Sequence, residues 1–159
     1  MTSAEKLVNI LLAKKLKISA AESCTGGMFI SKLIDFPGTS EIIGASYITY
    51  SNEAKIKAVG VKPETIENFG VVSENTAFEM AVGAMNTANS DIGVGITGFA
   101  GPCEDDDPDA GKVCFGFSVN GKTVTSTKRF GNIGRNAVRE LSCLYAVETL
   151  IKLINTFGV

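Results

Sequence analysis

The residues best suited to chemistry lie in the stretch 20–27, which reads A-A-E-S-C-T-G-G. An apolar run precedes this stretch and apolar residues at helical spacing follow it, so we expect a strand–turn–helix corner. Its glycines let the backbone approach a ligand where helix N–H groups are unpaired, and such a corner can hold an anion or a developing oxyanion. Ser23 is therefore a candidate nucleophile, and capping of the helix by Ser23 or Thr25 is the alternative.

Lys55 is the candidate general base. The chain contains no histidine, so Ser-His-Asp and Cys-His machinery is excluded and acid–base chemistry must use Lys, Tyr or carboxylates. If Ser51 or Asn52 caps a helix, Lys55 lies in its first turn, near the positive end of the helix dipole. A lysine acts as a base only when neutral, and burial beside a helix N-terminus lowers its pKa. A surface lysine is the alternative.

Cys24 is a rival nucleophile, because a thiol is intrinsically more reactive than a hydroxyl and this one also lies near a helix start. Without a histidine it lacks the usual base. The cysteines form no C-x-x-C pair, so we expect reduced thiols and no zinc site. They are Cys24, Cys103, Cys114 and Cys143.

The sequence alternates helical and strand-like segments. Helices are expected at 3–15, 26–34, 52–58, 63–69, 74–88 and 135–156, the last with Val138, Leu141, Tyr145 and Ile151 inward. Strands are expected at 18–21, 42–50, 91–97, 112–119 and 122–130, with a tight hairpin at Asn120-Gly121. This order predicts an α/β fold, a three-layer α/β/α sandwich with a mixed, mainly parallel sheet of about five strands whose last two form an antiparallel hairpin. Ligands bind beyond the carboxyl ends of strands in such sheets, where the loops 22–27, 51–55 and 98–101 should converge.

Composition narrows the class of protein. A length of 159 residues with 45% apolar composition fits one domain, residues 1–159. A net charge of -2 without a basic block argues against nucleic-acid binding. Lysines at 14, 15 and 17 interrupt the N-terminal apolar run, so we expect neither a signal peptide nor a membrane span, and a soluble cytoplasmic protein.

Five motifs together resemble the CinA C-terminal domain family, the nicotinamide-nucleotide amidases. They are E-S-C-T-G-G at 22–27, Y-S-N-E-A-K at 50–55, G-V-V-S-E at 70–74, T-G-F-A-G-P at 97–102 and R-x-x-V-R at 135–139. The resemblance runs in order from about residue 7 to residue 154. It implies hydrolysis of the carboxamide of nicotinamide mononucleotide to nicotinate mononucleotide and ammonia in pyridine-nucleotide recycling, without metal or cofactor. It also implies a homo-oligomer.

The resemblance assigns roles to residues. Ser23 becomes the nucleophile, favoured over Cys24, and Lys55 its base, with Tyr50 orienting Lys55, relaying a proton or simply packing in the core. Arg135 and Arg139, one turn apart at a helix start, suit the substrate phosphate, or are surface arginines. The full expected substrate-binding set is Glu22, Thr25, Gly26, Gly27, Asn52, Thr97, Gly98, Gly101, Arg135 and Arg139, with N–H groups of the 23–27 turn and the 97–98 loop as oxyanion donors.

Two departures from the family pattern leave an alternative open. The family usually has Phe-x-Gly-Asp-Arg before the last helix, whereas residues 130–135 read F-G-N-I-G-R, with one extra residue and no Asp. Residues 103–109 are acidic rather than glycine-rich; a solvated loop is expected rather than a Mg²⁺ or Ca²⁺ site, and if it lines the site it discourages extra phosphates. A non-catalytic pyridine-nucleotide or phosphate-binding module is the alternative function. Longer family members carry a further N-terminal hydrolase domain, for which we expect no room here.

Overall fold

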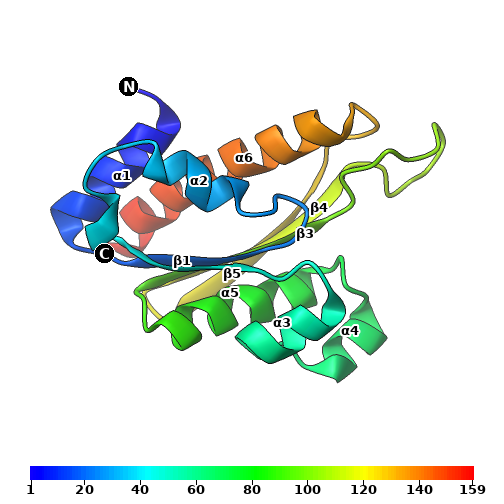
Figure 1. Ribbon diagram of the computed structural model, residues 1–159, viewed down its shortest axis with the longest axis horizontal. Coiled ribbons are helices and arrows are strands. Elements are labelled where there is room, and N and C mark those ends of the chain that lie inside the picture. The colour runs from blue at the N-terminus through cyan, green and yellow to red at the C-terminus, as the bar shows by residue number, and fades with distance from the viewer.

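A five-stranded sheet lies between two layers of helices in the computed structural model, which describes residues 1–159 (Figure 1). α1, α2 and α6 cover one face, and α3, α4 and α5 cover the other. The helices are α1 (Ser3–Lys14), α2 (Met28–Ile34), the 3₁₀ helix η1 (Thr39–Glu41), α3 (Asn52–Val59), α4 (Pro63–Phe69), α5 (Glu74–Ala88) and α6 (Arg135–Phe157). The strands are β1 (Ile18–Glu22), β2 (Ile43–Ile48), β3 (Ile92–Gly98), β4 (Lys112–Val119) and β5 (Lys122–Arg129). The predicted α/β/α sandwich is confirmed.

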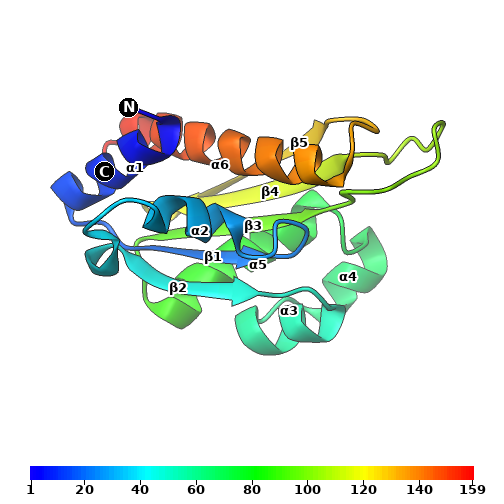
Figure 2. The same cartoon turned by 45° about the horizontal axis from the view of Figure 1, so that its top comes forward.

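The sheet has the strand order β2-β1-β3-β4-β5, with β2 at one edge (Figure 2). β1 pairs in parallel with both β2 and β3, whereas β4 runs antiparallel to β3 and to β5. Asn120 and Gly121, with φ of 51° and 71°, form the tight turn between β4 and β5. The sheet is therefore mixed, and β4 alone runs against the other strands.

The carboxyl ends of β1, β2 and β3 lie at one edge of the sheet. In register, Glu22 at the end of β1 pairs with Ile48 of β2 and with Ile96 of β3. The loops that follow these three strands therefore begin side by side, as expected for ligand sites in sheets of this kind.

The N-terminus of α2 and one face of α6 differ from the sequence prediction. α2 begins at Met28 rather than at residue 26, because Gly26 and Gly27 adopt φ of 58° and 92° and extend the turn. Leu141 was expected to face inward but is 40% exposed, because the buried stripe of α6 is set by neighbouring positions. That stripe consists of Val138, Ser142, Cys143, Ala146, Val147, Leu150 and Ile154. The 3₁₀ helix η1 was not predicted. No helix combines the length and the apolar composition needed to cross a membrane.

α5 packs unusually close to the sheet because glycines of β3 and β4 face it. A Cβ atom at Gly116 would lie 2.2 Å from the Ala77 carbonyl oxygen, and one at Gly95 would lie 2.4 Å from the same atom. Real Cβ atoms do not approach backbone this closely, so a side chain at either position would force α5 away from the sheet.

We expect Gly116→Ala to lower the free energy of unfolding by about 1–3 kcal/mol, the usual cost of overpacking a core. Gly116 does not have a positive φ, so the effect reports packing rather than backbone strain. Urea unfolding followed by circular dichroism measures it. An unchanged midpoint would mean that α5 can shift without loss of packing.

Candidate active site

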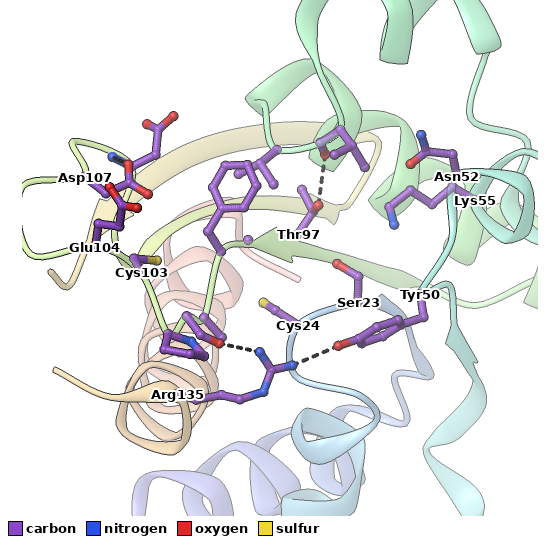
Figure 3. A pocket seen from close by; sticks show the side chains of 18 residues that line it. Ser23, Cys24, Tyr50, Asn52, Lys55, Thr97, Cys103, Glu104, Asp107 and Arg135 are labelled. Carbon is purple, nitrogen blue, oxygen red and sulfur yellow. Dashed lines mark hydrogen bonds between the residues drawn. The ribbon is translucent and has the colours of Figure 1, made fainter. Parts of the chain in front are cut away.

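A cavity of about 760 Å³ lies at the edge of the sheet where β1, β2 and β3 end (Figure 3). Its walls come from the loops after β1 and β2, from the connection between α4 and α5, from the loop between β3 and β4 with its acidic residues, and from the start of α6. Ser23, Cys24, Lys55, Thr97 and Arg135 are among the residues that line it.

Ser23 is fixed directly after β1 by the neighbouring strand. Its backbone N–H donates to the Ile96 carbonyl oxygen at 3.0 Å, and its Oγ donates to the same oxygen at 3.2 Å. The side chain is only 7% exposed, and this exposed part faces the cavity. Ser23 is therefore reachable by a ligand yet held by a rigid strand.

Lys55 lies in the first turn of α3, where Ser51 is the N-cap and accepts a hydrogen bond from the Ala54 N–H at 3.0 Å. The side chain is 1% exposed, so the surface-lysine alternative is wrong. Its Nζ donates to the Thr49 carbonyl oxygen at 2.6 Å, and no carboxylate forms an ion pair with it. Burial lowers the pKa of Lys55, only partly opposed by the nearby Cys24 thiol. A larger neutral fraction at physiological pH follows.

The Ser23 hydroxyl and the Lys55 amine point into the same space from opposite walls (Figure 3). No hydrogen bond joins them: the serine hydroxyl donates to the Ile96 carbonyl and the lysine amine donates to the Thr49 carbonyl. Catalytic hydrogen bonds are often unformed in ligand-free proteins. To give its proton to Lys55, the hydroxyl must turn away from the Ile96 carbonyl.

Glu22 caps α2 from within the core. It is fully buried, and its carboxylate accepts the N–H groups of Gly27 and Phe29 at 3.1 Å and of Ile30 at 3.2 Å. Neither Ser23 nor Thr25 caps the helix, so that alternative is wrong. The carboxylate therefore already occupies the helix N-terminus.

Two N–H groups of the turn have no acceptor. Gly26 donates to the Ser23 carbonyl, Gly27 to Glu22 and Met28 to the Thr25 carbonyl, whereas the N–H groups of Cys24 and Thr25 make no hydrogen bond. Both adjoin Cys24, which lies on the cavity wall next to Ser23. These two donors are available to an anionic atom of a ligand.

Cys24 is poorly suited to nucleophilic attack. Burial and, to a smaller extent, the charge of Glu22 raise the pKa of its thiol to about 11, because together they outweigh the turn N–H groups and Arg139, which lower it. The thiolate, which is the reactive form, is therefore scarce at neutral pH.

Tyr50 and Arg135 form a bridge at the cavity mouth (Figure 3). Arg135 donates from Nη2 to the Tyr50 hydroxyl at 2.8 Å and from Nη1 to the Gly101 carbonyl at 2.6 Å. Tyr50 is 64% exposed, so it does not pack in the core. Lys55 Nζ is held by the Thr49 carbonyl, and a role for Tyr50 in orienting Lys55 or relaying a proton stays a prediction.

The structure places the other expected binding residues in two groups. On the cavity wall lie Asn52, Thr97, Gly98 and Gly101, with the Thr97 hydroxyl donating to the Val71 carbonyl at 2.9 Å. Away from the wall lie Glu22, Thr25, Gly26, Gly27 and Arg139. Glu22 and Arg139 hydrogen-bond to the turn itself, whereas the buried Thr25 hydroxyl has no hydrogen-bond partner. Contact of these five residues with substrate stays a prediction.

Two backbone contacts that support the site were not indicated by the sequence. The carbonyls of Thr49 and Ile96, which hold the two reactive side chains, carry no signal in residue type. The acidic loop does line the cavity, through Glu104, Asp107 and Asp109, and its composition was the available signal. These carboxylates do not gather into a group that could hold a metal ion.

Comparison with known proteins identifies the family and the fold of this chain. The CinA C-terminal domain description matches residues 1–154. A putative competence-damage inducible protein of Alkaliphilus metalliredigens is 46% identical over 151 residues, covering 94% of this chain and 36% of that protein. A CinA-like protein of Kosmotoga olearia is 45% identical over 145 residues, covering 91% of this chain and 35% of that protein. The chain thus spans about a third of the length of these curated relatives.

Solved structures of the same family have the same fold. The crystal structure of a competence-damaged protein (CinA) superfamily protein from Escherichia coli aligns with a TM-score of 0.89 at 34% identity, covering 95% of this chain and 88% of that one. The competence/damage inducible protein from Agrobacterium tumefaciens aligns with a TM-score of 0.87 at 34% identity, covering 96% of each chain.

Proposed function

Because the chain belongs to the CinA C-terminal domain family, we propose that it hydrolyses the carboxamide of nicotinamide mononucleotide to nicotinate mononucleotide and ammonia, as a step in pyridine-nucleotide recycling. The observation that carries the proposal is a serine and a buried, uncompensated lysine on the wall of one cavity. In a chain without histidine this pair is the best available nucleophile and base.

The first half of the reaction forms an acyl-enzyme. The Ser23 Oγ attacks the carboxamide carbon while Lys55 Nζ takes the hydroxyl proton, and the carbonyl electron pair moves onto oxygen. The free N–H groups of Cys24 and Thr25 stabilise that oxyanion. When the intermediate collapses, the C–N bond breaks, Lys55 returns the proton to nitrogen, and ammonia leaves.

The second half regenerates the enzyme. Water attacks the nicotinoyl ester, Lys55 takes its proton, and the ester C–O bond breaks as Ser23 regains a proton. The sum is amide plus water to acid plus ammonia, so no metal or redox cofactor is needed. Covalent catalysis suits an amide because it divides one difficult step into two easier ones.

Ammonia release from nicotinamide mononucleotide by the wild-type protein is the direct test. Release that is saturable and coupled one to one with nicotinate mononucleotide supports the amidase. Nucleotide binding measured by calorimetry without any ammonia supports the alternative, a pyridine-nucleotide or phosphate-binding module. The absence of both release and binding would contradict both functions.

The acidic loop predicts a preference for the mononucleotide. Glu104, Asp107 and Asp109 line the cavity, whereas Arg135 is its only arginine. Carboxylates repel a second phosphate, so a dinucleotide carrying the same carboxamide should be the poorer substrate.

We expect the double variant Glu104→Gln, Asp107→Asn to raise kcat/KM for the dinucleotide relative to the mononucleotide by about fivefold, or roughly 1 kcal/mol of removed repulsion. Both changes keep the side-chain shape, and the amide introduced in place of the Asp107 carboxylate retains an oxygen for the Asp109 N–H. Asp106→Asn is the matched control, because Asp106 is in the same loop but off the cavity wall. Equal wild-type turnover of the two nucleotides would contradict the preference.

A further inference from the structure

Arg139 holds the backbone of the catalytic turn. Its Nε donates to the Cys24 carbonyl at 3.0 Å and its Nη2 to the Thr25 carbonyl at 3.2 Å. Its Nη1 donates to Asn136 Oδ1 at 3.2 Å. The guanidinium is partly buried, forms no ion pair and does not line the cavity. Two of its three hydrogen bonds therefore go to peptide oxygens of the turn.

These contacts fix where two N–H groups point. In a trans peptide the C=O and the N–H of the same unit point in opposite directions. The Cys24 carbonyl belongs to the peptide whose N–H is that of Thr25, so the bond to Arg139 Nε turns the Thr25 N–H away from Arg139. In the preceding peptide the Ser23 carbonyl accepts a hydrogen bond from the Gly26 N–H. The Cys24 N–H of that peptide therefore points away from Gly26.

The two unpaired N–H groups flank the α-carbon of Cys24. Cys24 lies on the cavity wall next to Ser23. A positively charged donor on a carbonyl also polarises the peptide, making its N–H a stronger donor. Glu22 supports the same geometry from the far side by accepting the Gly27 N–H.

We propose that Arg139 is a positioning residue that locks the Cys24–Thr25 peptide, so that the N–H groups of Cys24 and Thr25 form the oxyanion hole for attack by Ser23. The inference rests on the proposed Ser23 chemistry but not on the identity of the nucleotide. It replaces the sequence-based expectation that Arg139 binds the substrate phosphate.

Steady-state kinetics separates positioning from phosphate binding. We expect Arg139→Gln to lower kcat for nicotinamide mononucleotide about 100-fold, the usual cost of a disabled oxyanion donor, with KM within about threefold of wild type. The kcat of Arg139→Lys should lie between those of Arg139→Gln and the wild type, because an ammonium keeps the charge but lacks the two-pronged guanidinium that reaches both carbonyls. Asn136→Ala, which loses only the outer contact of Arg139, should stay within about threefold of wild type. A raised KM with unchanged kcat would assign Arg139 to phosphate binding and overturn the proposal.

A second assay needs no nucleotide. With p-nitrophenyl acetate, Ser23 Oγ forms an ester to the acetyl carbon, Lys55 takes the hydroxyl proton and p-nitrophenolate leaves; mass spectrometry locates the acetyl group. We expect the acylation rate to fall in Arg139→Gln by a factor similar to the fall in kcat. If acylation depends on Arg139 but the mononucleotide releases no ammonia, the proposed substrate is wrong and the role of Arg139 still holds. Acylation at the wild-type rate in Arg139→Gln, or no wild-type acylation at Ser23, overturns the inference.

The amide resonances report the geometry directly. In ¹⁵N-labelled protein, Arg139→Gln should shift the Thr25 and Cys24 N–H resonances while those of β3 stay in place. Should Arg139→Gln fail to fold, Arg139→Lys carries the same three measurements with smaller expected changes. If the Thr25 and Cys24 resonances do not move in a folded variant, Arg139 does not fix the orientation of the Cys24–Thr25 peptide.

Discussion

Replacing Ser23 with alanine is expected to lower kcat for nicotinamide mononucleotide about 10⁴-fold or more, while KM changes less than about threefold. The side chain removed carries the hydroxyl that lies across the cavity from the Lys55 amine. Without it, water must attack the amide directly, without a covalent intermediate. Ammonia release under saturating substrate measures the loss.

Cys24→Ala is the matched control for this change. It removes the adjacent side chain on the same wall but leaves the backbone N–H and the Arg139 contact to the Cys24 carbonyl in place. We expect activity within about fivefold of wild type, because the high pKa of the thiol leaves little thiolate to react. Loss of activity in Cys24→Ala with survival in Ser23→Ala would transfer the nucleophile to the cysteine.

The order of elements followed from the sequence because local signals and the global fold agree. Ser51 and Ser73 cap α3 and α5, Pro63 begins α4, and Asn120-Gly121 turns the hairpin, each as its residue type dictates. Because ligands bind beyond the carboxyl ends of strands in such sheets, the loops of Ser23 and Lys55 could also be expected to lie together. Burial of Lys55 was less predictable, since most lysines are exposed.

The support around the site could not be predicted, because much of it runs through backbone atoms. Glu22 and Arg139 belong to two of the motifs that indicated the site. Their residue types do not reveal that Glu22 caps α2 and that Arg139 donates hydrogen bonds to two backbone carbonyls. A charged residue in a ligand-binding motif is easily assigned to the ligand, whereas here both charges organise the turn. Leu141 was misplaced for another reason: an apolar residue at the border of a helical stripe can face either side.

Replacing Lys55 with methionine is expected to lower kcat about 10³-fold or more, since the general base and the proton donor to ammonia are lost together. Lys55→Arg should be comparably impaired, because arginine stays protonated. In the wild type, kcat/KM should rise with pH as Lys55 loses its proton, with a midpoint below the ordinary lysine value of about 10.4. A flat profile between pH 6 and 9 in a chemistry-limited assay would remove Lys55 from the mechanism.

The same lysine should reduce stability where it is charged. Unfolded Lys55 titrates near 10.4, but burial lowers the pKa in the folded protein. Between the two values the unfolded state binds more protons, so wild-type stability rises with pH through this window, by at most about 1.4 kcal/mol per pH unit. Below the folded pKa the protein bears the full cost of a buried charge, and above 10.4 it bears none.

Lys55→Met cannot titrate, and the Thr49 carbonyl that it leaves unpaired adds a penalty independent of pH. Urea unfolding at pH 7 and pH 10 should therefore show the stability of Lys55→Met relative to wild type decreasing as pH rises. A constant difference would mean that Lys55 titrates normally in the fold and is no better a base than a surface lysine.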